Sequence, residues 1–136
     1  MSDSSMTQPH DQVIDERVLD DYANDGTMAF ATLLIQQYQL EADTDINALS
    51  AAIAVDSEAA IVATAHHLRG AAATIGAASL SALCGELEAT ARRRGLSDAR
   101  WLGDAIAAEH LRVLTALDRW CLTHGARAAD HRWTRE

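Results

Sequence analysis

Apolar residues recur every three or four positions along most of the chain, which is the pattern of α-helices that bury one face. The pattern predicts a short helix over residues 13–23 and a longer one over residues 28–41. The longer helix could continue, straight or kinked, through residues 42–53, so one helix and two helices both remain open. The residues that share one side of the segment 28–41 are Phe30, Leu33, Leu34, Gln37 and Tyr38.

Two further helices are predicted after a break at residues 55–57. Ser57 is expected to cap a helix over residues 58–74, because a serine side chain can accept a hydrogen bond from a free amide of the first turn. In the same way, Ser79 is expected to cap a helix over residues 80–94.

The last predicted helix begins near Ser97 and ends near Gly125, since glycine often follows the end of a helix. The segments 1–12 and 125–136 are polar and are predicted to be tails. Residues 13–124 then form a single predicted domain.

Short loops between consecutive helices favour antiparallel neighbours. The sequence therefore predicts an all-α protein, an up-down four-helix bundle with one or two short additional helices on its N-terminal side. Composition agrees with this fold, because the 136 residues include 28 alanines and a single proline. A hydrophobic share of 49% with 23% charged residues is that of a folded domain.

The net charge and the cysteine content limit which partners and which compartment are expected. A net charge of −9 argues against nucleic acid and against an anionic membrane as main partners, since both need a basic surface. The chain has no long apolar run and no basic leader before an apolar segment. Its two cysteines, Cys84 and Cys121, suit a reducing cytoplasm. The Met1 start suggests a free-standing protein.

The helix over residues 58–74 carries the candidate chemistry. On a helical wheel Gly70 lies opposite the apolar stripe, with His66 and Arg69 beside it, one turn apart, and His67 on the other flank. The residues of the stripe itself are Ile61, Ala65, Leu68, Ala72 and Ile75.

An exposed glycine inside a helix costs about 1 kcal/mol relative to alanine. At Gly70 it would leave room for a partner to approach His66, whose neutral imidazole is a nucleophile at cytoplasmic pH. Arg69 would place a guanidinium near an anionic group on that ring. The arrangement suits a histidine that accepts a phosphoryl group, although a surface histidine that is only solvated stays open on geometry alone.

Other kinds of chemistry find little support. Adjacent histidines diverge on a helix, and His66 has no ligand four residues away, so no metal site is expected. Glu109 and His110 do not have the spacing of a metal-binding bundle. The chain contains no glycine-rich phosphate loop, so no nucleotide, no cofactor and no enzymatic activity of its own are expected.

The motif on two adjacent helices resembles the histidine-containing phosphotransfer (HPt) domain of bacterial phosphorelays. The family pattern is a histidine, any residue, an aliphatic residue, a Lys or Arg and a glycine, with a second glycine six residues later; here it falls on residues 66–70 and Gly76. A leucine-rich helix follows, with Leu80, Leu83, Cys84, Leu87 and Glu88. The resemblance extends over about residues 13–123.

The resemblance implies a role for each motif residue. His66 is the implied phospho-acceptor, whereas His67 falls on the variable position. Arg69 would stabilise the phosphoryl group, Gly70 would give the partner access, and Gly76 would end the helix.

On the following helix, Glu88 falls where the family often has a Gln or Glu that hydrogen-bonds the acceptor ring, so it is a candidate for orienting His66. Glu88 could equally pair with Arg92 one turn away, and both contacts can hold together. Arg92 is also a candidate basic neighbour of the phosphoryl site.

The implied function is to carry a phosphoryl group between aspartates of response-regulator receiver domains, with a hybrid histidine kinase as a further candidate partner. The receiver would supply Mg²⁺, and the protein itself, expected to be a monomer, would need neither metal nor nucleotide. Receivers would dock around His66 and Gly70, with Val13 and Ile14 as candidate apolar contacts. The alternative is a helical interaction module that binds a receiver or another regulator without being phosphorylated.

Overall fold

The computed structural model describes the backbone of residues 13–93 and 95–135, and side chains as far as residue 124. The helices in this part of the chain are α2 (Glu16–Asp25), α3 (Met28–Ala54), α4 (Glu58–Thr74), α5 (Ala78–Arg92) and α6 (Leu96–Arg135). They are joined by short connections, as the sequence pattern predicts.

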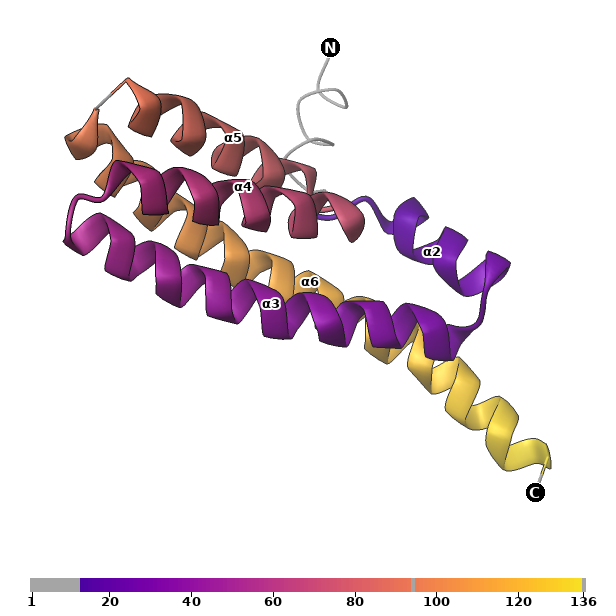
Figure 1. Cartoon of the computed structure of the whole chain (residues 1–136). Coiled ribbons are helices and arrows are strands. Elements are labelled where there is room, and N and C mark those ends of the chain that lie inside the picture. Colours follow the sequence, from indigo (N-terminus) through magenta and orange to yellow (C-terminus); the bar gives the residue numbers. More distant parts are fainter. Residues whose placement is uncertain (1–12, 94, 136) are drawn as a thin grey trace, which may run out of the picture.

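The four longer helices form a bundle in which each packs against two neighbours (Figure 1). α4 contacts α3 and α5, and α6 closes the ring by contacting α5 and α3. α2 packs against α3 at one end of the bundle. The predicted all-α, up-down bundle with a short N-terminal helix is therefore confirmed.

α3 is one continuous helix of 27 residues, which settles the choice between one helix and two. The apolar face that the large side chains of α3 predict is only partly the buried one, because Phe30 is 45% and Leu33 58% exposed. The bundle instead contacts a face of α3 that combines large residues with alanines, which let neighbouring helices approach closely. The buried residues of α3 are Ala31, Ile35, Tyr38, Ala42, Asp45, Leu49 and Ala52.

α4 follows its prediction along its whole length. The Ser57 hydroxyl accepts a hydrogen bond from the Ala60 amide at 3.3 Å, and the predicted apolar stripe is fully buried. The helix ends at Thr74. Gly76 follows with φ of 81°, a left-handed backbone conformation that residues with a side chain rarely adopt. The Asp15 amide donates to the Gly76 carbonyl at 2.8 Å, which joins the entry to α2 to the end of α4.

Four predicted helix ends are displaced, namely the starts of α2 and α5 and the ends of α5 and α6. α2 begins at Glu16 instead of residue 13, because the Asp15 carboxylate caps it by accepting from the Arg17 amide. α5 begins at Ala78, so Ser79 lies inside the helix and the predicted serine cap is wrong.

α5 ends at Arg92, two residues before its predicted end. The predicted end of the last helix is also wrong, because α6 continues through Gly125 to Arg135. A single glycine inside a helix costs only about 1 kcal/mol, which neighbouring helix-forming residues can offset. The division into one domain and two tails stays a prediction.

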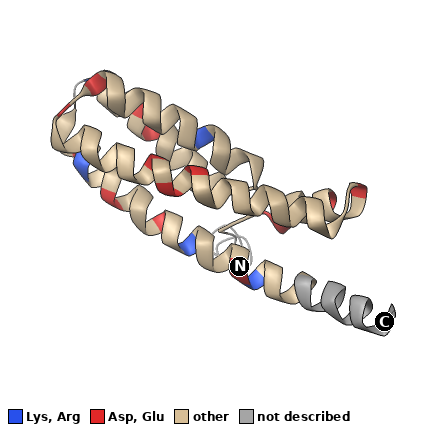
Figure 2. Ribbon diagram, turned by 60° about the horizontal axis from the view of Figure 1, so that its bottom comes forward, with Lys and Arg blue, Asp and Glu red and all other residues tan. Residues whose placement is uncertain are grey.

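α2 is held to the bundle by hydrogen bonds as well as by packing. The Tyr22 hydroxyl donates to the Thr74 carbonyl at 2.9 Å, and the Trp120 indole donates to Asp20 at 3.0 Å. Figure 2 shows acidic residues on several helices and scattered basic residues among them, in keeping with the net charge of −9. Within the described part of the chain, no helix is long and apolar enough to span a membrane.

Candidate functional site

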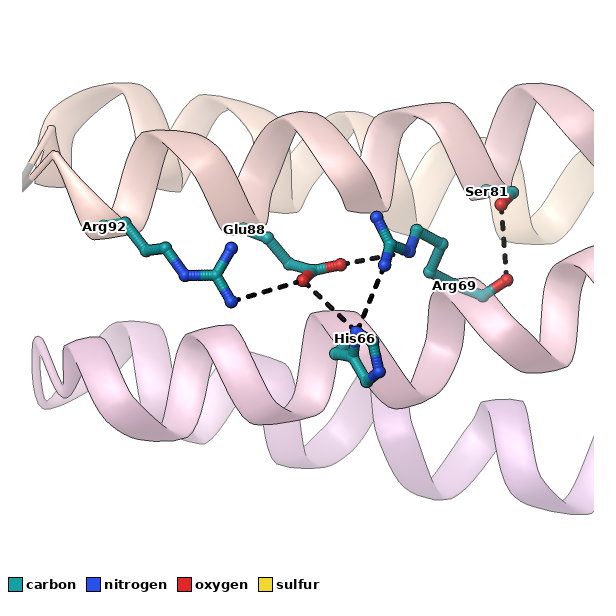
Figure 3. A network of polar contacts seen from close by, with 5 residues as sticks. All are labelled: His66, Arg69, Ser81, Glu88 and Arg92. Atoms are coloured by element: carbon teal, nitrogen blue, oxygen red, sulfur yellow. Dashed lines mark hydrogen bonds and ion pairs between the residues drawn. The ribbon is translucent and has the colours of Figure 1, made fainter.

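Four of the predicted site residues lie together where α4 packs against α5 (Figure 3). His66 Nδ1 is 3.3 Å from Glu88 Oε1, and Arg69 Nε is 3.2 Å from Glu88 Oε2. Arg92 Nη2 lies 3.7 Å from Glu88 Oε1, so the contact one turn along α5 exists beside the contact to the ring. Glu88 is thus the common partner of one imidazole and two guanidinium groups.

The Glu88 side chain is only 4% exposed, whereas the His66 side chain is 66% exposed. A buried carboxylate is costly unless cations or hydrogen bonds compensate it. Among the described residues, Glu88 Oε2 lacks a hydrogen bond of good geometry, and its compensation is the ion pair with Arg69. The charge balance of the cluster therefore depends on its arginines.

The contact with Glu88 favours one tautomer of His66. A carboxylate can only accept a hydrogen bond, so we assign the ring proton to Nδ1, and Nε2 keeps its lone pair. Arg69 Nη2 also lies 3.2 Å from Nδ1, but a guanidinium only donates, and that contact would favour the opposite tautomer. The contact with the carboxylate prevails, because the charged acceptor stabilises the Nδ1 proton and Arg69 is itself paired with Glu88.

Arg69 is positioned by contacts that the sequence does not reveal. Its carbonyl accepts a hydrogen bond from the Ser81 hydroxyl at 3.3 Å, which ties α4 to the first turns of α5. Its side chain lies over Gly85, where an added Cβ would be 3.6 Å from Nη1. An added Cβ would therefore meet Arg69 at ordinary van der Waals distance, so Gly85 packs beneath the guanidinium without being required there by space. Both contacts depend on helix packing, so no local sequence signal could have identified Ser81 or Gly85.

Gly70 is exposed on the outer face of α4, one turn after His66. A Cβ added at this position would meet no described atom within 4 Å. The glycine is therefore not required by packing within the described structure. What it provides is a flat, open strip of helix backbone beside His66.

His67 turns to the other side of α4 and contacts α3. Its Nδ1 lies 2.6 Å from Asp45 Oδ2, and the Asp45 side chain is only 12% exposed. The hydrogen bond to Asp45 and the charge of Asp45 raise the pKa of His67, and Glu41 adds to the effect. The two adjacent histidines therefore occupy different electrostatic surroundings.

The apolar residues expected to assist docking do not both remain available. Ile14 is 4% exposed and belongs to the core, while Val13 is half-buried against it. α3 instead exposes Phe30, Leu33 and Leu40, the last of these at 72%. No group of three or more His, Cys, Asp or Glu residues in the described part of the chain could hold a metal ion.

The family model of the Hpt domain matches residues 33–120, which contain all of α4 and α5 and the cluster around Glu88. The chain belongs to the Hpt domain family. As an Hpt domain, it is a phosphotransfer protein of two-component phosphorelays, a phosphoryl carrier.

A solved structure supports the assignment to the Hpt family. The bundle is similar to the crystal structure of histidine-containing phosphotransfer protein B (HptB) from Pseudomonas aeruginosa PAO1. The TM-score is 0.71 at 28% sequence identity, over 80% of this chain and 96% of that one. No curated protein matches this Hpt domain.

Proposed function

We propose that His66 is the phospho-acceptor of this Hpt domain and that it exchanges the phosphoryl group with aspartates of response-regulator receiver domains. The observation that carries the proposal is the pairing of an exposed His66 with the buried Glu88 through Nδ1. This pairing leaves Nε2, the atom that must attack, unprotonated. The position of His66 in the Hpt motif supports the same assignment.

In the transfer step, the Nε2 lone pair of His66 attacks the phosphorus of an aspartyl phosphate on the receiver. The bond between phosphorus and the aspartyl oxygen breaks, and the carboxylate leaves with the electron pair. The ring keeps its Nδ1 proton, and the positive charge that develops on it faces Glu88 at 3.3 Å. The reverse step returns the phosphoryl group to another receiver.

Arg69 is the phosphoryl-stabilising residue of this proposal. Its guanidinium already lies within 3.2 Å of the acceptor ring and is 43% exposed, so it is accessible to an incoming anion. Arg92, which lies 3.7 Å from the same Glu88 oxygen that contacts His66, adds a second positive charge to the cluster. Mg²⁺ would come with the receiver, which also supplies most of the transition-state stabilisation.

The partner would approach across Gly70, where the helix surface is open. Receiver domains and a hybrid histidine kinase are the proposed partners, and the protein is proposed to act as a cytoplasmic monomer. Phe30 and Leu33 of α3 replace the buried Ile14 as candidate apolar contacts.

The test is transfer of label from phosphorylated receiver domains to the wild type, His66→Gln and His67→Gln. We expect acid-labile label on the wild type and on His67→Gln, and none on His66→Gln. Label that depends on His67 would contradict the assignment of the acceptor. A receiver that binds tightly but labels no form would instead favour the non-phosphorylated interaction module.

A further inference from the structure

The two adjacent histidines make contacts of the same kind. His66 presents Nδ1 to Glu88 on α5, and His67 presents Nδ1 to Asp45 on α3. Both carboxylates are largely buried, while the imidazole side chains are 66% and 60% exposed. Accessibility and hydrogen bonding alone would therefore allow either ring to react through Nε2.

The charges around the two rings differ. The carboxylate behind His66 is paired with Arg69 and Arg92, so positive charge exceeds negative charge in that cluster. The carboxylate behind His67 has no arginine partner among the described residues, and Glu41 adds a further negative charge near the ring. A phosphoryl donor, which is itself an anion, is attracted to the first ring and repelled from the carboxylates beside the second.

We propose that Asp45 is a specificity-determining residue, which withholds the Nε2 of His67 from phosphoryl transfer and so confines the phosphoryl group to His66. This inference rests on the proposed function of His66. The contact at 2.6 Å is short enough for a charged imidazolium–carboxylate pair. An imidazolium carries protons on both nitrogens and has no lone pair with which to attack phosphorus.

The groups that face His67 all favour its charged form. From α3 these groups are Asp45 and Glu41, whose hydrogen bond and charges raise the pKa of His67. On α5, the charged side chains of Glu88 and Arg92 are engaged in the cluster at His66. Cys84 lies buried in the core, and the charges of Glu88 and Asp45 both act on it. Burial raises the pKa of its thiol to about 12, so the thiol stays neutral.

The first test needs no phosphorylation. NMR spectroscopy of the imidazole nitrogens follows the titration of His67 in the wild type and in Asp45→Asn, an isosteric variant whose amide oxygen can still accept from Nδ1. We expect the titration midpoint of His67 to fall in the variant. Asp43→Asn is the matched control, because Asp43 also lies on α3 but contacts His110 at 3.1 Å. An unchanged midpoint in Asp45→Asn would overturn the proposal.

The second test uses phosphoramidate, a small donor that needs no docking. Its P–N bond breaks as the imidazole nitrogen attacks, and ammonia leaves. In the His66→Gln background, we expect adding Asp45→Asn to raise the rate of labelling of His67 several-fold at neutral pH. The ratio of the two rates should approach one at alkaline pH, where His67 is neutral with and without the Asp45→Asn substitution.

These outcomes separate this inference from the proposed function. Equal labelling rates with and without Asp45→Asn at neutral pH would overturn the role of Asp45, whatever receivers do. Failure of every receiver to label His66 in the wild type would overturn the proposed function, even where phosphoramidate still distinguishes the variants. Label mapped to His67 in the wild type with Asp45 intact would contradict both.

Discussion

At the scale of single residues, Glu88 connects the groups that the proposed chemistry needs. Its buried carboxylate fixes the ring of His66 and holds Arg69 beside it. We expect Glu88→Ala to slow phosphotransfer by about 10-fold, because the Nδ1 proton of His66 loses its acceptor and Arg69 loses its ion pair. Glu88→Gln should retain much more of the rate, since its amide oxygen can still accept from Nδ1. The measurement is the initial rate of label transfer; equal rates for the two variants would contradict a role in orienting the ring.

Substitutions of Gly70 separate the stability of the fold from the access of a partner to His66. Gly70→Ala should raise the free energy of unfolding by about 1 kcal/mol, because alanine is the better helix former and no described atom obstructs its Cβ. Gly70→Gln should also fold but transfer poorly from receivers, since its side chain would stand on the open strip beside His66. Urea unfolding and transfer assays check the two effects. Normal labelling of Gly70→Gln by phosphoramidate would show that the loss lies in docking.

Which site residues the sequence reveals depends on how far their partners lie along the chain. His66, Arg69 and Gly70 share one helix face, so their spacing predicts their proximity. The contact between His67 and Asp45 crosses from α4 to α3 and depends on the register in which the helices pack. No pattern within either helix contains that information, and the same reasoning applies to Gly85 beneath Arg69.

At the scale of the elements, Gly76 joins the end of α4 to the entry of α2. Its φ of 81° and the 2.9 Å between an added Cβ and the Asp15 carbonyl both oppose a side chain there. We expect Gly76→Ala to lower the free energy of unfolding by about 1–3 kcal/mol. Urea unfolding measures this change, with Gly70→Ala as the matched glycine control. A free energy of unfolding of Gly76→Ala that is no lower than that of the wild type would contradict the backbone requirement.

Helix existence was easier to predict than helix ends and faces. α4 has a strong apolar stripe and a serine cap, and both features lie within its own sequence. α5 has no side-chain cap, so its start is set by the turn after Gly76, and the serine at position 79 was misleading. The buried face of α3 includes Ala31 and Ala42, whose small size hides them from a pattern based on large apolar residues.

At the scale of the whole molecule, the pair formed by His67 and Asp45 links α3 to α4 and couples stability to pH. Because the folded state raises the pKa of His67, the pair stabilises the protein fully below the ordinary value of 6.5. That contribution is lost as the pH rises through the raised pKa of the folded state. The difference in unfolding free energy between wild type and Asp45→Asn should therefore be largest near pH 6 and shrink towards alkaline pH. Urea unfolding over this pH range measures it, and a constant difference would contradict the linkage.

The central claim is that Glu88 directs the lone pair of His66 to Nε2, where it accepts the phosphoryl group. The most direct measurement is NMR spectroscopy of the phosphorylated protein, labelled with a nitrogen isotope, to find the ring nitrogen that is coupled to phosphorus. We predict coupling to Nε2 of His66 while Nδ1 keeps its proton. Coupling to Nδ1 of His66, or to either nitrogen of His67, would contradict the account.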